Sequence, residues 1–349
     1  MTNRVLVSGA NGFIASHAIE KLLKQGSEVV GTLRNPADAA KSAHLRAMEG
    51  AGERLSLVAA DLNDADPFGA HADVDHVLHM ASPYRLNVRD PQRDLVDPAV
   101  HGTLSMLKAA ARSPRVSRVV LTSSMAAITD NPDGRVLTEA DWNTESSLDR
   151  NPYYFSKTLA ERAAWDFMAV EKPRFDLVVI NPFLVIGPSH TAAVNESNKV
   201  LVDLATGRYP AILALNWGFV DVRDVADAHI AAIATKEAEG RYICASGNVD
   251  MKALAEVMTK GGYGKGKLPR LRLDGRIGTA LMKLVSFTQP RGVGSYLRTH
   301  LGRIPRFSTA KARADLGIWF RDPVDSIEDT LADLAKWGHI PPAEPAATR

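Results

Sequence analysis

Short apolar runs alternate with segments of helical apolar spacing through the first half of the chain. The clearest helical pattern covers residues 14–25 and is followed by Gly26, a residue type that commonly ends helices. The apolar runs have the length of buried strands, and they are 4–7, 28–33, 55–59, 76–80, 118–122 and 176–180. Strands that alternate with helices predict an α/β fold, with a doubly wound parallel sheet covered by helices on both faces. Ligands of such sheets bind at the carboxyl ends of the strands.

The regular alternation of predicted strands and helices ends after Asn181 and Pro182. Residues 217–222 and 241–245 are predicted as late strands that return to the sheet, and 249–340 is rich in helical patterns interrupted by Gly and Pro. We therefore expect residues 1–185 and 216–246 to form the nucleotide-binding domain. The remaining residues are expected to form a smaller, mostly helical substrate-binding lobe from 186–215 and 247–340, followed by a disordered tail at 341–349.

Composition and charge narrow the class of protein. Hydrophobic residues make up 45% of the 349 residues and charged residues 23%, which is typical of a globular protein. The net charge of +2 gives the whole chain no drive toward nucleic acid, and no apolar run is long enough to span a membrane. The single cysteine, Cys244, cannot form an intrachain disulfide, and the first residues lack the pattern of a secretory signal, so we expect none. We expect a cytoplasmic monomer or homodimer with a small-molecule substrate.

A glycine-rich turn connects the first predicted strand to the first predicted helix. Gly9 permits a tight turn, Gly12 lets the backbone approach a pyrophosphate, and Ala15 lets the helix pack closely on the strand. The exposed N–H groups at the start of a helix attract an anion. With this setting of strand, turn and helix, the pattern predicts a Rossmann-type dinucleotide site that includes Asn11.

The end of the second strand indicates which dinucleotide binds. A site for NAD places an acidic residue there, whereas this chain has Arg34, with Lys41 close behind. Two cations suit the 2′-phosphate of NADP(H). Asp61 and Leu62, which follow the third strand, are placed to meet the adenine.

Tyr153 and Lys157 are candidates for acid–base chemistry. They lie four residues apart at the start of a predicted helix and so share a face, whereas Tyr154 has no lysine at that spacing. A free tyrosine has a pKa of about 10, and a neighbouring ammonium lowers the pKa of a phenol toward its working range. Ser123 and Ser124 end the fifth strand, where a hydroxyl can donate to a substrate oxygen that gains negative charge. We choose Ser124.

Together, the glycine turn, the strand end at Ser124, the Tyr153–Lys157 pair and the segment 181–188 resemble the extended short-chain dehydrogenases/reductases. Within them the chain looks most like the dihydroflavonol, cinnamoyl-CoA and yeast-type aldehyde (methylglyoxal) reductases. The resemblance supports Ser124 over Ser123, and implies that Tyr153 donates the proton and that Lys157 also holds the nicotinamide ribose. It further implies a cofactor site made of Phe13, Ile14, Arg34, Lys41, Asp61, Leu62, Met80, Ala81, Ser82, Thr122, Pro182, Leu184 and Ser197.

Substrate contacts are less well specified. Pro83 and Tyr84 follow the fourth strand and can reach a substrate, and Thr129 stands where plant flavonoid reductases carry an asparagine, so we do not expect a flavonoid. His76 and His79 lie three apart on a strand without further ligands nearby, so no metal site is expected.

The segment 260–313 contains 13 Lys or Arg residues and one acidic residue, Asp274. Within it, 277–287 is predicted to be an apolar helix. This segment can form a lid with a solvated basic face, attract an anionic substrate, or contact a membrane surface.

The function predicted from these observations is NADPH-dependent reduction of aldehydes and ketones to alcohols, in a reversible reaction. Two alternatives stay open. One is an NAD(P)-dependent epimerase or dehydratase that acts on a nucleotide sugar with the same three residues. The other is a non-catalytic NADP-binding redox sensor.

Overall fold

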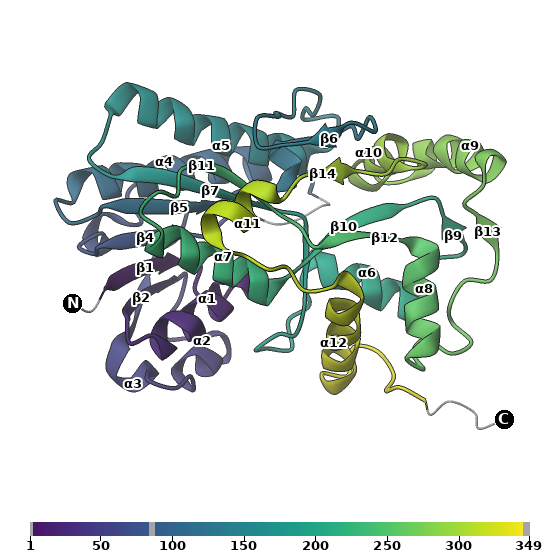
Figure 1. Cartoon of the computed structure of the whole chain (residues 1–349), viewed down its shortest axis with the longest axis horizontal. Coiled ribbons are helices and arrows are strands. Elements are labelled where there is room, and N and C mark those ends of the chain that lie inside the picture. The colour runs from purple at the N-terminus through teal and green to yellow at the C-terminus, as the bar shows by residue number, and fades with distance from the viewer. Residues whose placement is uncertain (1–2, 84–87, 345–349) are drawn as a thin grey trace.

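A seven-stranded parallel sheet forms the centre of the computed structural model, which describes residues 3–83 and 88–344 (Figure 1). The strands lie in the order β11-β7-β5-β4-β1-β2-β3. Their bounds are β1 (Arg4–Ser8), β2 (Glu28–Leu33), β3 (Leu55–Ala59), β4 (His76–His79), β5 (Arg118–Thr122), β7 (Asp176–Pro182) and β11 (Gly240–Cys244). The chain order reverses between β1 and β4, and this reversal opens a crevice at the carboxyl edge of the sheet. The predicted doubly wound fold is confirmed.

Two pairs of helices cover the two faces of this sheet. α1 (Phe13–Lys24) and α7 (Val222–Ala234) pack against one face, and α4 (Asp97–Arg112) and α5 (Pro152–Glu171) against the other. Apart from those of the edge strand β3, most side chains of these strands are buried on both faces, which explains why most of the strands are continuous apolar runs rather than alternating patterns.

The rest of the chain forms a second layer of structure with its own apolar core, built around Trp217, Phe219, Met251 and Ile327. It contains the sheet β12-β10-β8 and the strand pair β13-β9. Its elements are β8 (Leu184–Ile186), α6 (Glu196–Ala205), β9 (Ile212–Leu213), β10 (Asn216–Asp221), β12 (Gly247–Asp250), α8 (Met251–Lys260), β13 (Arg272–Leu273), α9 (Arg276–Val285), α10 (Arg291–His300) and α12 (Pro323–Lys336).

One predicted strand pairing is wrong. Residues 217–222 were expected to return to the large sheet, but β10 pairs with β8 and β12 instead, and Val222 already begins α7. The place beside β7 is taken by β11, as expected for 241–245. Gly218 of β10 packs against the ring of Phe183, where an added Cβ atom would lie 2.7 Å from the ring. An apolar pattern identifies a strand but does not specify which strand it pairs with.

The remaining elements are short: α2 (Ala39–Arg46), α3 (Ala51–Arg54), η1 (Gly69–His71), η2 (Gln92–Val96), η3 (Met125–Ala127), β6 (Val136–Leu137), η4 (Ser286–Thr288), β14 (Arg306–Phe307) and α11 (Ala310–Leu316). In the tail, the backbone N–H of Glu344 donates to Gly262 and its carboxylate pairs with Lys265. Among the described residues, no helix is both long and apolar enough to cross a membrane.

Candidate active site

A cleft of about 1160 Å³ lies between the carboxyl edge of the large sheet and the second core. Most of the predicted site residues line it. They are Gly9, Gly12, Phe13, Ile14, Met80, Ser82, Thr122, Ser124, Thr129, Tyr153, Lys157, Pro182, Leu184 and Ser197. Predicted residues that do not line it are Asn11, Arg34, Lys41, Asp61, Leu62, Ala81 and Pro83. Tyr84 lies outside the described residues.

The glycine turn has the geometry that a pyrophosphate site needs. Gly9 has a positive φ of 66°, and a Cβ atom there would lie 3.1 Å from the Cα of Ala81. Gly12 precedes α1 without a side-chain cap, and no acidic residue occurs in the first turn of the helix. Phe13 and Ile14, whose N–H groups open the helix, both line the cleft. The N-terminus of α1 therefore presents uncapped donors and no opposing charge to an anion.

Arg34 and Lys41, the two cations predicted at the adenosine end of the cofactor site, differ in their contacts within the protein. Arg34 directly follows β2 and is exposed at the carboxyl edge. Lys41 pairs with Asp38 at 3.5 Å, which ties its ammonium to α2. Asp61 accepts hydrogen bonds from the backbone and the side chain of Asn63, so this carboxylate also stabilises its own turn. Arg34 is thus the more direct candidate for a phosphate contact.

Tyr153 and Lys157 lie one turn apart on α5, and both line the cleft. The Nζ atom of Lys157 lies 6.0 Å from the centroid of the Tyr153 ring. Burial lowers the pKa of Lys157 to about 8, against the opposing effect of the Glu161 carboxylate. A buried ammonium beside a phenol is suited to tuning proton transfer at that phenol.

The two serines at the end of β5 have different partners. The Ser123 hydroxyl donates to the buried Glu161 carboxylate at 2.5 Å. The Ser124 hydroxyl instead accepts from the backbone N–H of Ala126 at 3.1 Å, which leaves its own proton available for donation. These contacts favour Ser124 as the donor to a substrate oxygen.

A buried polar network behind this pair escaped the sequence analysis. Glu161 is fully buried and accepts from Ser123, from Asn181 at 2.8 Å and from Arg241 at 2.6 Å. The guanidinium of Arg241 also lies 4.0 Å from the ring of Trp142. Glu161 follows Lys157 by four residues and so lies on the same helix face. This spacing is the one signal in the sequence that could have identified Glu161. Its partners come from distant strands.

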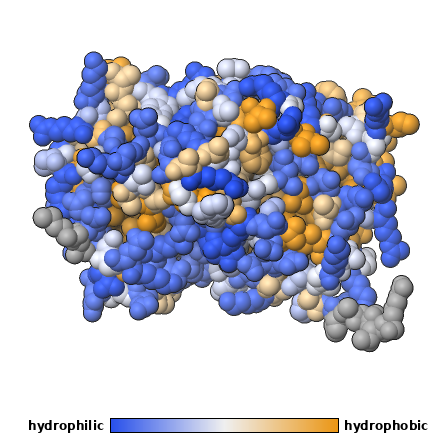
Figure 2. All heavy atoms as spheres, in the orientation of Figure 1, coloured by the Kyte–Doolittle hydropathy of each residue, from blue (hydrophilic) through white to orange (hydrophobic). Residues whose placement is uncertain are grey.

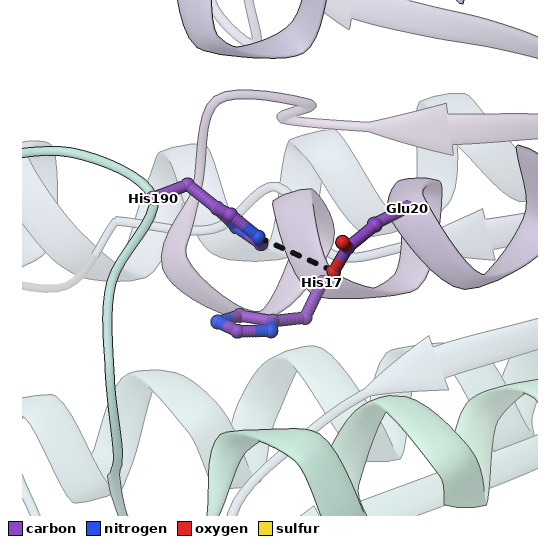
Figure 3. Close-up of side chains that lie close together, drawn as sticks. All are labelled: His17, Glu20 and His190. Carbon is purple, nitrogen blue, oxygen red and sulfur yellow. Dashed lines mark ion pairs between the residues drawn. The ribbon is translucent and has the colours of Figure 1, made fainter. Parts of the chain in front are cut away.

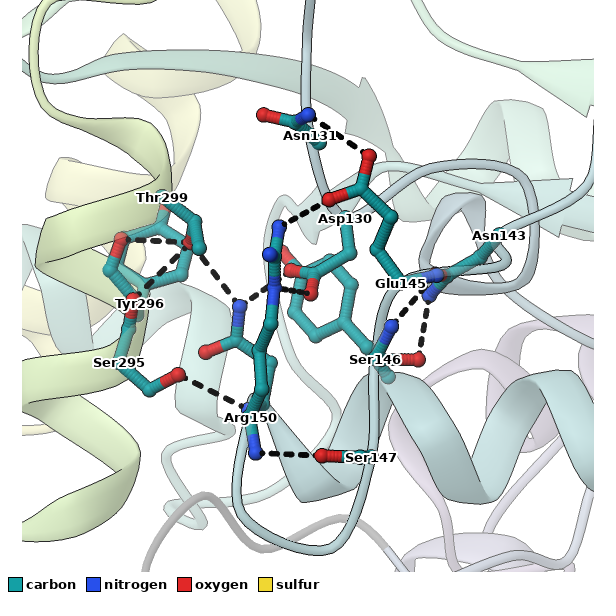
Figure 4. A network of polar contacts seen from close by, with 12 residues as sticks. Asp130, Asn131, Asn143, Glu145, Ser146, Ser147, Arg150, Ser295, Tyr296 and Thr299 are labelled. Carbon is teal, nitrogen blue, oxygen red and sulfur yellow. Dashed lines mark hydrogen bonds and ion pairs between the residues drawn. The ribbon is translucent and has the colours of Figure 1, made fainter.

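A second network holds the N-terminus of α5 (Figure 4). Asn151, just before Pro152, has a left-handed backbone with φ of 48°. Its side-chain amide donates to the buried carboxylate of Asp130 and to Thr299 at 3.0 Å, and its backbone N–H donates to Ser295. Burial raises the pKa of Asp130 to about 6, even though Arg150 lies beside it. These contacts fix the start of the helix that carries Tyr153 against α10.

Figure 3 shows the one group of described residues whose donor atoms could hold a metal ion: His17, Glu20 and His190, with ligand atoms within 4.8 Å of one another. These groups also bond within the protein. His17 Nε2 lies 2.9 Å from the carbonyl oxygen of Pro188, and His190 Nε2 lies 3.3 Å from Glu20. The cluster joins α1 to the loop after β8. His79, which the sequence analysis weighed as a ligand, is buried against Ser8.

Residues 5–245 match the NAD dependent epimerase/dehydratase family. The chain belongs to this family. Over 343 residues it is 37% identical to cinnamoyl-CoA reductase 1 of Petunia hybrida, a match that covers 97% of this chain and 93% of that protein. It is 42% identical over 247 residues to cinnamoyl-CoA reductase CAD2 of Medicago truncatula, covering 69% and 75%.

The fold of this family member also resembles solved structures. It superposes on the yeast methylglyoxal/isovaleraldehyde reductase Gre2, solved with NADPH, with a TM-score of 0.79 and 28% identity, covering 96% of this chain and 99% of that one. The resemblance to extended short-chain dehydrogenases/reductases inferred from the sequence is confirmed.

Proposed function

We propose that this protein is an NADPH-dependent reductase that converts aldehydes and ketones to alcohols. The observation that carries the proposal is the common cleft of Tyr153, Lys157 and Ser124, in which a buried ammonium lies beside one phenol. The reductase names of the curated relatives agree with this assignment.

NADPH fits the residues present. The open N-terminus of α1 and the close backbone approach at Gly9 suit the pyrophosphate, and Arg34 suits the 2′-phosphate. The solved relative Gre2 contains the same cofactor. When bound, NADPH supplies the hydride that forms the new C–H bond and is itself oxidised to NADP⁺.

The chain's own residues act on the carbonyl oxygen. The Ser124 hydroxyl donates a hydrogen bond to this oxygen and stabilises the negative charge that develops as the C=O π bond breaks. The Tyr153 Oη transfers its proton to the oxygen and so completes the alcohol. Lys157 favours the resulting phenolate through its positive charge and orients the ribose. The reverse sequence oxidises an alcohol.

The walls of the cleft indicate the shape of the substrate. The lining of the cleft includes apolar and aromatic side chains, among them Phe183, Leu215, Trp217, Met282 and Leu297. Thr129 replaces a side chain that would hold a flavonoid. A carbonyl compound with an apolar or aromatic body fits this lining.

The experiment is an NADPH-oxidation screen of the purified protein over aromatic aldehydes, diketones, ketoesters and acyl-CoA thioesters, with NADH in parallel. We expect turnover of at least one carbonyl class and a preference for NADPH. Absence of turnover in every class, together with interconversion of a nucleotide sugar such as UDP-galactose, would replace the proposal with epimerase chemistry.

A further inference from the structure

The charges of this protein are segregated along the chain. The segment 260–313 carries 13 Lys or Arg residues and only Asp274 as an acid, whereas the rest of the chain carries 29 Lys or Arg against 39 Asp or Glu. Asp274 is itself engaged by both donor groups of Arg272, at 3.1 and 2.6 Å. The net charge of +2 is therefore the sum of a strongly basic segment, 260–313, and an acidic remainder of the chain.

The same region exposes apolar side chains. Seven of the twelve large hydrophobic residues that are exposed in the described part of the chain lie between positions 271 and 304. They are Leu271, Ile277, Leu281, Leu284, Phe287, Val293 and Ile304. Singly exposed apolar residues are ordinary on a protein surface, but a cluster on one element marks an interaction site.

Helix α9 carries the centre of this cluster. Ile277, Leu281 and Leu284 follow one another at spacings of four and three, so they share one helix face. Ile277 is 88% exposed and Leu284 68%, and Phe287 in the next turn is 71% exposed. No residue of α9 is fully buried. Arg276 and Lys283 supply cations on the same helix.

The inner side of α9 forms part of the cleft wall. Met282 and Val285 line the cleft, so the helix forms part of its wall while its other face stays in solvent. Among the described residues of segment 260–313, those that line the cleft include no lysine or arginine. The basic charge of the segment is therefore directed to the outer surface and not to the reacting atoms.

The outer surface of this end combines both kinds of residue. Figure 1 places α9 and α10 at the end of the molecule farthest from the N-terminus, and Figure 2 shows hydrophobic and hydrophilic residues side by side there. An apolar helix face with cations around it and almost no acids has the chemistry of helices that lie in the interface of an anionic bilayer. Nucleic acid would need the cations but not the exposed leucine and isoleucine side chains.

We propose that the outer face of α9, together with Phe287, docks this protein on an anionic phospholipid surface. Ile277, Leu281 and Leu284 enter the boundary between head groups and acyl chains, and Arg276 and Lys283 on the same helix contact the lipid phosphates. The inner side of α9, with Met282 and Val285, still lines the cleft, so docking through the outer side leaves the proposed reaction site in place.

The test is flotation of the full chain with vesicles made of equal parts phosphatidylcholine and phosphatidylglycerol, compared with vesicles of phosphatidylcholine alone. We expect binding to the anionic vesicles only, weakened by added salt. The double variant Ile277→Glu/Leu284→Glu should lose at least about tenfold in vesicle affinity, because two apolar contacts are replaced by charges of the lipid's own sign. The matched control Val170→Glu/Trp319→Glu adds the same charges at exposed apolar positions outside the basic segment and should bind like the wild type.

Three outcomes would overturn the proposal. The first is a wild type that does not float with anionic vesicles, and the second is an α9 variant that floats as well as the wild type. The third is a wild-type dimer in light scattering that the α9 variant dissociates, without vesicle binding, which would make the face a subunit interface. NADPH oxidation with a water-soluble aldehyde, measured on the same variants, should stay unchanged, so a failure of docking is distinguishable from a failure of the proposed reaction.

Discussion

Lys157 and Glu161 lie one turn apart on α5, and the carboxylate of Glu161 opposes the effect of burial on the pKa of the lysine. Glu161 is also bound to Arg241, so one buried carboxylate links the proposed proton-transfer site to the edge strand β11. Removal of this charge should therefore affect both the lysine and the fold.

The variant Glu161→Gln tests this link. Loss of the carboxylate leaves Arg241 buried without its charged partner, which should lower the free energy of unfolding by about 3 kcal/mol or more. It should also lower the pKa of Lys157 further and move the corresponding limb of the pH profile of kcat to lower pH. Glu171→Gln, at the exposed end of the same helix, is the control. An unchanged profile in a folded Glu161→Gln protein would show that the carboxylate does not act on Lys157.

Arg34→Ala tests the cofactor assignment. Removal of a guanidinium from the 2′-phosphate should raise the KM for NADPH roughly tenfold to a hundredfold and leave the KM for NADH nearly unchanged. Arg46→Ala removes a nearby exposed cation that stands on α2 and serves as the control. If both variants raised the KM for NADPH equally, Arg34 would contribute only to the general positive charge of this region and would not contact the 2′-phosphate.

The buried histidines predict how stability depends on pH. Burial lowers the pKa of His79 to about 3 and those of His229 and His300 to about 4, from the ordinary 6.5. The unfolded chain therefore binds protons that the folded chain excludes. Their contribution to stability is complete above pH 6.5 and is lost as the pH falls from 6.5 toward 4, by up to about 1.4 kcal/mol per pH unit for each group. Asp130 and Asp224, whose pKa values burial raises, act in the opposite direction, whereas His17, with a pKa lowered to about 4, adds a fourth histidine that acts in the same direction.

Urea unfolding at pH 7.5 and at pH 5 measures this dependence. We expect a clear decrease in unfolding free energy at the lower pH. In the variant His229→Gln, residue 229 cannot titrate but can still reach Thr122. The unfolding free energy of this variant should decrease less than that of the wild type. A wild-type stability that is flat over this interval would contradict the assignment of these histidines as buried and neutral.

Asn151 provides a test of how α5 is positioned. Asn151→Gly retains the left-handed backbone but loses the amide contacts with Asp130 and Thr299, whereas Asn151→Ala also strains the backbone. We expect kcat to fall in both variants with little change in the KM for NADPH, because the start of the helix that carries Tyr153 shifts. The alanine variant should be less stable than the glycine variant by about 1 kcal/mol. Wild-type kcat in both would show that the network serves stability only.

The features that could be predicted from the sequence are local ones. The glycine turn, the strand ends and the Tyr153–Lys157 spacing each depend on neighbouring residues, and the structure brings most of them to one cleft. The partners of Glu161 and Asn151 lie on segments far away in the chain, such as Arg241 and Thr299, so no local pattern announces them. The wrong pairing of β10 has the same cause, because an apolar run identifies a strand but not its neighbour.

The central claim is that the phenol of Tyr153 donates the proton. The most direct measurement is NADPH oxidation by Tyr153→Phe, compared with Tyr154→Phe, with NADPH binding followed by fluorescence in both variants. Both should bind NADPH, Tyr154→Phe should retain most of its turnover, and Tyr153→Phe should lose about a hundredfold or more. Wild-type turnover in Tyr153→Phe would contradict the mechanism.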